Sequence, residues 1–294
     1  MIKINGGEIV VKSLEIQGVE RIFCIPGESF LPILDALQNS KIDTVLARHE
    51  GGAAMMAEAD GKLTGRPGIV LVTRGPGATN ASAGIHIAQQ DSTPLIMLVG
   101  QVSRDMRGRD AFQEINLKQM FSGMCKYVEE IEDISNLNQA IAEAFKISME
   151  GRPGPVVLSL PQDMLYDTLD SIIFSSRIKI HHPSPSSDEI FNIKSLLTKS
   201  KEPIVIAGGS LWDIETIHKL EDFAAAYKIP IVSSFRRQSI INNLSPYYAG
   251  DLGLGCNPAL INRIKTADLL ILIGGRLSEI PSQSYTLLNI PIPQ

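Results

Sequence analysis

The sequence predicts an α/β protein whose first part is a doubly wound parallel sheet. Three apolar runs of strand length, residues 68–73, 93–100 and 154–161, are continuous rather than alternating. Continuous runs are typical of parallel strands that are covered on both faces. Helical patterns lie between these runs, and this alternation of strand and helix indicates a parallel sheet with helices on both sides.

Each element of this part has a local signal. Apolar residues at helical spacing run from residue 6 to residue 17 and stop at Gly18. The stretch 50–63 is rich in Ala and Met, which suits a buried helix. The predicted order is helix 6–17, strand 19–27 with its Pro26-Gly27 turn, helix 28–40, strand 43–49, helix 50–63, strand 68–73, a helix, strand 93–100, helix 135–150 and strand 154–161.

A shift in composition near residue 177 divides the chain. Residues 177–189 mix Pro and Ser with two adjacent histidines, His181 and His182, which we interpret as solvated residues of a linker. We place a first domain at residues 1–175, a linker at 176–188 and a second, Rossmann-like α/β domain at 189–294. The chain closes on "NIPIPQ" soon after a new segment opens, so we expect a truncated second domain and a fragment of something longer.

Composition excludes several classes of protein. A chain of 294 residues with 44% hydrophobic and 20% charged residues is long enough for two globular domains. The net charge of −5 argues against a nucleic-acid surface. Without a signal peptide or an apolar run of about 20 residues, we expect a cytoplasmic protein outside the membrane. No Cys-x-x-Cys spacing suggests zinc, and we expect three buried, inert thiols at Cys24, Cys125 and Cys256.

Glu50 is the first candidate for a functional side chain. It follows the strand 43–49 at its carboxyl end, the edge at which open α/β sheets bind ligands. The helix after it carries little charge, so we expect its carboxylate to face apolar surroundings, where burial raises a carboxyl pKa. Such a Glu can relay a proton to a ring nitrogen. A Glu that only interacts with its helix dipole gives the same local pattern.

Two loops follow strands on the same side of the sheet. Residues 73–80, "TRGPGATN", lack both the third glycine of a dinucleotide motif and the Gly-Lys-Ser/Thr ending of a P-loop. Gly75 and Gly77 would let the backbone approach a flat ring or a partner chain, and a tight connection without a ligand is the alternative. In residues 107–114, "RGRDAFQE", Gln113 offers a donor and an acceptor beside the flat wall of Phe112.

Together these segments resemble a known family. The strings "FCIPGESFLPILDAL", "RHEGGAAMMAEADGKLTGRPGIVLVTRGPGATN", "DSTPLIMLVGQV", "GRDAFQE" and "GRPGPVVLSLPQD" occur in order and at suitable spacing. The chain resembles the amino-terminal half of a thiamine-diphosphate enzyme of the acetolactate synthase (acetohydroxyacid synthase) large-subunit type. The resemblance is dense over residues 6–163 and looser from residue 187 on.

The resemblance implies a thiamine diphosphate site in the first domain. Glu50 would hydrogen-bond the pyrimidine ring nitrogen and favour the imino tautomer that removes the thiazolium C2 proton, and Gln113 would approach the reacting carbon. A 2-keto acid such as pyruvate would lose carbon dioxide and be condensed with a second 2-keto acid, as in branched-chain amino acid biosynthesis. The ring would be flanked by Pro26 and Gly27, and its seat shaped by Thr73, Pro76, Gly77 and Asn80.

The resemblance also bears on other cofactors and on assembly. Acetolactate synthases bind FAD in the second domain, whereas many relatives keep the domain without a flavin, so plain β–α turns remain the alternative there. Family active sites form between the first domain of one subunit and the third domain of another, which implies a homodimer or tetramer. The residues implied for FAD are Gly208, Gly209, Gly274, Gly275 and Arg276.

Two departures from the family pattern leave alternatives open. Gly51 stands where synthases usually carry Gln, so the substrate stays open between a carboligase and another lyase or decarboxylase. The third domain's Gly-Asp-Gly motif is missing, since "GDLGLG" at 250–255 lacks its third-position glycine. We therefore predict no metal ligand in this chain and expect Mg²⁺ to be held by the missing domain. The chain is either truncated or half of a split enzyme, and in both cases we expect it to be inactive by itself. The remaining alternative is that it is a non-catalytic partner fragment.

Overall fold

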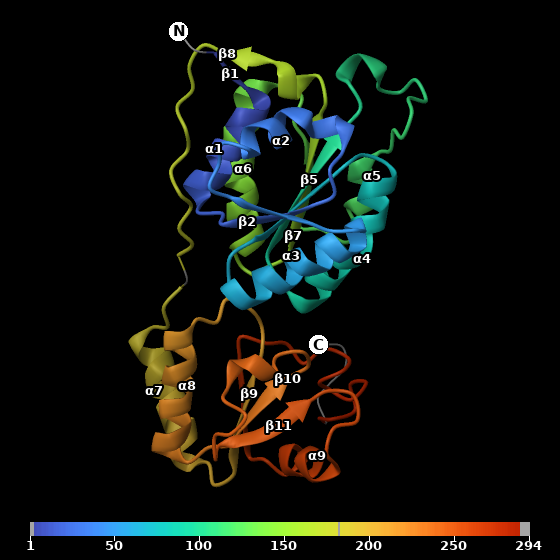
Figure 1. Ribbon diagram of the computed structural model, residues 1–294. Helices are drawn as coiled ribbons and strands as arrows, with labels where there is room; N and C mark the ends of the chain where they lie inside the picture. The colour runs from blue at the N-terminus through green and yellow to red at the C-terminus, as the bar shows by residue number, and fades with distance from the viewer. Residues whose placement is uncertain (1–2, 182, 289–294) are drawn as a thin grey trace. The chain divides into compact units, whose positions relative to one another are not determined.

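The computed structural model describes residues 3–181 and 183–288 of the chain. Two compact units, Met1–His181 and His182–Gln294, divide it, and each is described by itself (Figure 1). Within the described residues, no helix combines the length and the apolar content that a membrane span requires.

A six-stranded parallel sheet forms the centre of the first unit (Figure 1). Its strand order is β3-β2-β4-β5-β7-β6, and every neighbouring pair is parallel. The three continuous apolar runs form β4, β5 and β7, which are buried at every residue, as predicted. The strands are β2 (Arg21–Cys24), β3 (Asp43–Leu46), β4 (Gly68–Val72), β5 (Leu95–Gln101), β6 (Tyr127–Glu130) and β7 (Pro155–Pro161).

Helices cover both faces of this sheet, which confirms the doubly wound fold (Figure 1). Alternate residues of β4 separate the two cores: Ile69 and Leu71 join one apolar cluster, and Val70 and Val72 join the other. The first cluster is closed by α1 (Gly6–Gln17), α2 (Leu31–Leu37) and α6 (Ile134–Met149), and the second by α3 (Glu50–Thr64), α4 (Pro76–Asp91) and α5 (Leu117–Phe121).

The first helix shows how local sequence sets its bounds. The Asn5 side chain accepts a hydrogen bond from the Glu8 N–H at 2.9 Å, and the Glu8 carboxylate accepts one from the Asn5 N–H at 2.7 Å. This capping box satisfies two of the N–H groups at the start of the helix. Gly18, with φ of 83°, ends the helix in the left-handed conformation that glycine adopts without strain.

Two helix predictions for this unit are wrong in part. The predicted helix 28–40 is a 3-10 turn, Glu28–Phe30, followed by α2, which already ends at Leu37. The predicted buried helix 50–63 is α3, but only one of its faces is buried. Its other face carries Met55, 44% exposed, and Leu63, 76% exposed. Ala and Met suit a half-covered helix as well as a buried one, so composition did not separate the two cases.

Helices α3 and α4 pack closely because Gly84 of α4 has no side chain. A Cβ at position 84 would lie 2.5 Å from the Ala54 Cβ and 2.7 Å from its carbonyl carbon. We expect Gly84→Ala to lower the free energy of unfolding by about 1–3 kcal/mol through overpacking. The control is Gly52→Ala in α3, where a Cβ meets nothing within 4 Å. This substitution should stabilise the helix by up to about 1 kcal/mol, because Ala has a higher helix propensity than Gly. Urea unfolding of the two variants checks this, and equal changes would contradict it.

An extended segment, residues 170–181, lies along α1 and α6; we call it the strap. Gln17 of α1 donates to the Ser176 carbonyl at 3.2 Å and accepts from the Ile178 N–H at 2.9 Å. Asn138 of α6 accepts from the Ser175 N–H and donates to the Ile173 carbonyl, both at 3.2 Å. Two side-chain amides therefore bind the strap's backbone as a neighbouring strand would. Before the strap, β8 (Thr168–Leu169) pairs antiparallel with β1 (Ile4–Asn5).

The second unit contains a four-stranded parallel sheet in the order β11-β10-β9-β12. It has apolar clusters on both sides, as predicted for a Rossmann-like domain. Helix α7 buries no residue fully, and its Phe191 is 71% exposed. The elements are α7 (Ser187–Lys199), β9 (Pro203–Ala207), α8 (Ile214–Tyr227), β10 (Ile231–Ser234), β11 (Tyr248–Leu252), α9 (Pro258–Lys265) and β12 (Leu269–Ile273).

The prediction of three buried thiols is wrong for two of them. Cys24 of β2 is buried, and desolvation raises its pKa to about 12. Cys125 and Cys256 are partly exposed, although desolvation raises the pKa of Cys125 to about 12 as well. None of the three is in a disulfide. All three thiols are therefore protonated near neutral pH, whatever their exposure.

Candidate functional site at the carboxyl edge of the first sheet

The fold brings the residues predicted for cofactor binding to one edge of the first sheet. Gly27 follows β2, Glu50 is the first residue of α3 after β3, and Thr73 follows β4. Because these strands are parallel neighbours, their carboxyl ends meet at one edge. The remaining predicted residues lie beside them: Pro26 before Gly27, and Pro76, Gly77 and Asn80 in the first turns of α4. We call these residues, with Gly27, Glu50 and Thr73, the edge site.

Gly27 and Gly77 pack closely against Thr73 at the base of the edge site. A Cβ on Gly27 would lie 2.8 Å from the Thr73 Cβ, and one on Gly77 would lie 2.9 Å from the Thr73 Cγ2. Thr73 is therefore enclosed by glycine on two sides. Its hydroxyl also shares a hydrogen bond of 2.7 Å with the buried Ser29. Any larger residue at Gly27 or Gly77 would displace Thr73.

Glu50 and Asn80 are connected directly. The Asn80 Nδ2 donates to the Glu50 Oε2 at 3.0 Å, so the first turns of α3 and α4 meet through these two side chains. The other carboxylate oxygen, Oε1, would lie 3.5 Å from a Cβ at Gly77. His49 caps α3, its Nδ1 accepting from the Gly51 N–H at 3.0 Å. Glu50 is half-buried in this chain, so its carboxylate is less enclosed than the sequence led us to expect.

Gln113 lies next to the edge site on the loop 103–116. Its backbone is left-handed, with φ of 66°, which is uncommon for a residue with a side chain. It packs against Gly75, where a Cβ would lie 2.7 Å from the Gln113 carbonyl oxygen. Arg74 holds the neighbouring residue, donating from Nε to the Phe112 carbonyl at 3.4 Å. Phe112 itself is 79% exposed, so it forms no apolar wall with the other residues that the structure describes.

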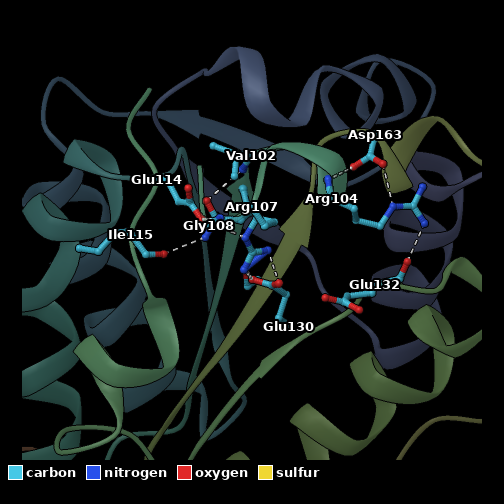
Figure 2. Close-up of polar contacts among 11 residues, drawn as sticks. Val102, Arg104, Arg107, Gly108, Glu114, Ile115, Glu130, Glu132 and Asp163 are labelled. Atoms are coloured by element: carbon cyan, nitrogen blue, oxygen red, sulfur yellow. Dashed lines mark hydrogen bonds and ion pairs between the residues drawn. The ribbon is translucent and has the colours of Figure 1, made fainter. Parts of the chain in front are cut away.

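Charged contacts hold this loop in place (Figure 2). Arg107 donates from both terminal nitrogens to the Glu130 carboxylate on β6, which also accepts from the Ser159 hydroxyl at 2.9 Å. Glu114 accepts from the Gly108 N–H at 2.8 Å and the Ala111 N–H at 3.3 Å. The hydrogen bond from Gly108 is the largest cause of the lowered pKa of Glu114. The loop is therefore closed on itself and fixed to the sheet.

A second ionic cluster holds the start of the same loop (Figure 2). Arg104 donates from Nε to Asp163 and from Nη2 to Asp167, both at 2.7 Å, and from Nη1 to the Glu132 carbonyl at 2.8 Å. The hydrogen bond with Asp163 is the main reason that the pKa of Arg104 is raised. No motif in the sequence marked the ion pairs of Arg104, Arg107 and Glu130. The acidic run 129–135 has the composition of a solvated face or loop, although its first two residues belong to β6.

The two Gly-Gly turns of the second unit contact each other. They follow the parallel neighbours β9 and β12, and a Cβ on Gly209 would lie 1.9 Å from the Gly274 carbonyl oxygen. A Cβ on Gly208 would lie 3.2 Å from the Gly275 Cα, and one on Gly275 would lie 3.1 Å from the Gly208 Cα. Trp212 donates from Nε1 to the Gly208 carbonyl at 2.8 Å. This close approach requires glycine with or without a ligand, and Arg276 follows directly as an exposed residue.

No group of three or more His, Cys, Asp or Glu in residues 3–181 and 183–288 is placed to hold a metal ion. His181 is exposed, and the prediction for His182 lies outside the described residues.

Comparison with protein families identifies both units. Residues 4–120 match the model described as "Thiamine pyrophosphate enzyme, N-terminal TPP binding domain", which includes the edge site and Gln113. Residues 190–292 match "Thiamine pyrophosphate enzyme, central domain". The two matches lie in the two structural units in the order that such enzymes follow.

Individual relatives agree with the family models. Acetolactate synthase isozyme 2 large subunit of Escherichia coli is 33% identical over 94% of this chain and 50% of its own length. Acetolactate synthase large subunit of Cyanidium caldarium is 35% identical over 94% of this chain and 49% of its own length. Acetolactate synthase of Bacillus subtilis is 31% identical over 93% of this chain and 48% of its own length. The chain thus spans about half the length of these relatives, and it belongs to the thiamine pyrophosphate enzymes.

Proposed function

We propose that this chain supplies the pyrimidine-binding half of a thiamine-diphosphate-dependent carboligase of the acetolactate synthase type. The observation that carries the proposal is the Glu50–Asn80 hydrogen bond above a glycine floor, inside the segment that matches the TPP binding domain. The substrates would be 2-keto acids, with pyruvate as the donor, because the relatives are named acetolactate synthases.

The edge site fits the aminopyrimidine ring of the cofactor. Gly27 and Gly77 carry no side chain and let Thr73 pack against their backbone, so the residues beside Glu50 stay small. Glu50 is the one carboxylate among the residues of the edge site, and a carboxylate is the group that can share a proton with a ring nitrogen. The Glu50 carboxylate and the Asn80 amide beside it therefore agree with the proposed ligand.

Each residue of the edge site has a defined task in this proposal. Glu50 holds a proton at the ring nitrogen, and Asn80 fixes the Glu50 carboxylate by donating to one of its oxygens. Thr73, which is hydrogen-bonded to Ser29, forms the base of the edge site. Gln113, on its closed loop, orients the substrate beside the ring. When bound, thiamine diphosphate supplies a nucleophilic carbon that adds to the keto group and takes up the electrons that decarboxylation releases.

Other parts of the assembly complete the proposal. We assign the diphosphate and Mg²⁺ to a domain outside these 294 residues and place the complete active site at an interface between subunits of a cytoplasmic homo-oligomer. FAD at Gly208, Gly209, Gly274, Gly275 and Arg276 is a secondary part of the proposal. The contact between the two turns already requires glycine at the first four of these positions, so the turns alone do not argue for a flavin.

Product analysis tests the proposed function. The chain is combined with the diphosphate-binding domain, as one polypeptide or as a partner chain, and supplied with pyruvate, thiamine diphosphate and Mg²⁺. We expect acetolactate, and no turnover from the chain alone. Acetaldehyde as the sole product would replace the carboligase with a decarboxylase. A thiamine-loaded assembly that turns over no 2-keto acid would reduce the chain to a non-catalytic partner.

A further inference from the structure

A cavity lies at the opposite edge of the first sheet from the edge site. Its volume is about 160 Å³, the room of about five water molecules at ~30 Å³ each. It is formed where α1 ends at Gly18, where β2 begins at Arg21, and where α3 is followed by Arg66. The strap closes its outer side with Arg177 and Ile178. The proposed function uses none of these residues.

Three guanidinium groups line this cavity, and two of them have partners. Arg66 donates to the Glu20 carboxylate at 2.9 Å and to the Gly18 carbonyl at 3.1 Å. Arg21 donates to Asp43 at 3.0 Å and lies 3.9 Å from Asp60. These contacts fix both guanidinium groups in the lining of the cavity.

Arg177 is the third guanidinium and differs from the other two. It lies over Gly18, where a Cβ would be 2.8 Å from its Cζ. Among residues 3–181 and 183–288, it forms no hydrogen bond and no ion pair. Its charge acts on Glu20, whose pKa is lowered mainly by Arg66 and to a smaller extent by Arg177. With Arg21, Arg66, Glu20 and Asp60, it leaves the charged lining of the cavity with an excess of one positive charge.

The uncharged part of the lining contains apolar side chains as well as the polar Gln17 and Thr64. Phe145 and Met149 of α6 and Ile178 of the strap face the cavity beside Arg177. A ligand that satisfies this lining carries one negative charge at one end and a short hydrocarbon chain at the other. A dianion fits less well because Glu20 and Asp60 repel it and the apolar wall desolvates it.

We infer that this cavity binds a small aliphatic carboxylate, with its charged end on Arg177 and Arg66 and its chain against Phe145, Met149 and Ile178. The strap determines whether the site exists, because it supplies Arg177 and Ile178. Gln17, which holds the strap at Ser176 and Ile178, itself lines the cavity. Binding is therefore expected to hold the strap more firmly to α1. The inference does not depend on the proposed function.

Titration of the 294-residue chain with acetate, butyrate and inorganic phosphate tests this inference, followed by ¹H–¹⁵N chemical shifts of the Gly18 and Ile178 amides. We expect saturable shifts with butyrate and an affinity that increases about fourfold for each added CH₂. Phosphate should bind more weakly than butyrate. Absent shifts, equal affinity for acetate and butyrate, or preference for phosphate would each overturn the inference.

A pair of strap variants locates the charged contact. Arg177→Gln should weaken butyrate binding about tenfold or more, the value of a lost charge-assisted hydrogen bond. Lys179→Gln removes the same charge two residues away, outside the cavity lining, and should leave the affinity within about twofold, because exposed charges act weakly at a distance. Equal effects of the two variants would show only general attraction of anions and would refute the site. Amide shift dispersion shows that both variants are folded.

Discussion

Replacing Glu50 with Gln in the assembled enzyme is expected to lower turnover of pyruvate by at least about a hundredfold, the lower range for loss of a positioned proton-transfer group. Gln has nearly the shape of Glu and keeps an oxygen that can accept from the Asn80 Nδ2. It cannot hold an ionisable proton against the cofactor ring. The rate of turnover and the exchange of the cofactor C2 proton for deuterium, followed by NMR, should fall together.

A matched variant separates this role from a helix-dipole effect. Glu215 also lies in the first turn of a helix, α8, and pairs with Lys219 on the same helix. Glu215→Gln removes the same interaction of a carboxylate with a helix dipole, so it should leave turnover unchanged. Circular dichroism should show both variants folded. If Glu50→Gln exchanges the C2 proton and turns over pyruvate as fast as the parent, Glu50 is a structural residue and the proposed function loses its main support.

Replacing Lys62 with Met is expected to lower the free energy of unfolding by about 3 kcal/mol, the lower end for breaking a buried ion pair. Lys62 of α3 contacts Glu58 at 3.0 Å and Asp91 at 2.6 Å. These carboxylates are only 9% and 8% exposed, so Met would leave two negative charges with little solvent. Glu58 would keep its hydrogen bond from Thr93 at 2.8 Å, which moderates the loss.

The control for this prediction is an exposed lysine on another helix of the same unit. Lys146 of α6 pairs with Glu143 at 3.5 Å, and both side chains are about half exposed. Exposed pairs contribute little, so Lys146→Met should change stability by less than about 1 kcal/mol. Urea unfolding of the two variants gives the comparison. Similar losses at both positions would mean that the Lys62 cluster is no stronger than a surface pair.

The sequence predicted those parts of the fold that rest on the chain's own periodicity. The strands around Ile69, Met97 and Val157 were found because a strand covered on both faces has no polar residue to interrupt it. The first helix was found with both ends correct, since Gly18 marks the end of the helix locally. These signals need no knowledge of distant contacts.

The parts that were missed depend on contacts between segments far apart in the chain. β6 shows no apolar alternation in the sequence, and Glu130 reveals its partner, Arg107, only after the loop folds against the sheet. The exposed face of α3 could not be separated from a buried one by Ala and Met alone. Likewise, the cavity beside Arg177 needs the strap, which Gln17 and Asn138 fix by hydrogen bonds to its backbone.

The residues of the candidate site were predicted through resemblance, and their local patterns were ambiguous. Glu50 alone fits a helix-dipole role, and only the arrangement of Asn80, Thr73 and Gly77 around it gives the site a shape. The residues that hold the Gln113 loop in place belong to no recognisable sequence motif. Arg74 and Glu114 act through backbone carbonyl and amide groups, which no sequence pattern marks.

The loop that carries Gln113 is fastened differently from the sheet below it. Arg104 and Arg107 hold it by half-exposed ionic contacts, whereas β4 and β5 are held by buried hydrocarbon. Dissolved salt screens charges over about 8 Å at physiological ionic strength, while kosmotropic salts strengthen apolar burial. A rising concentration of a kosmotropic salt therefore acts on the two layers in opposite directions, loosening the loop that would orient a substrate while it stabilises the sheet beneath.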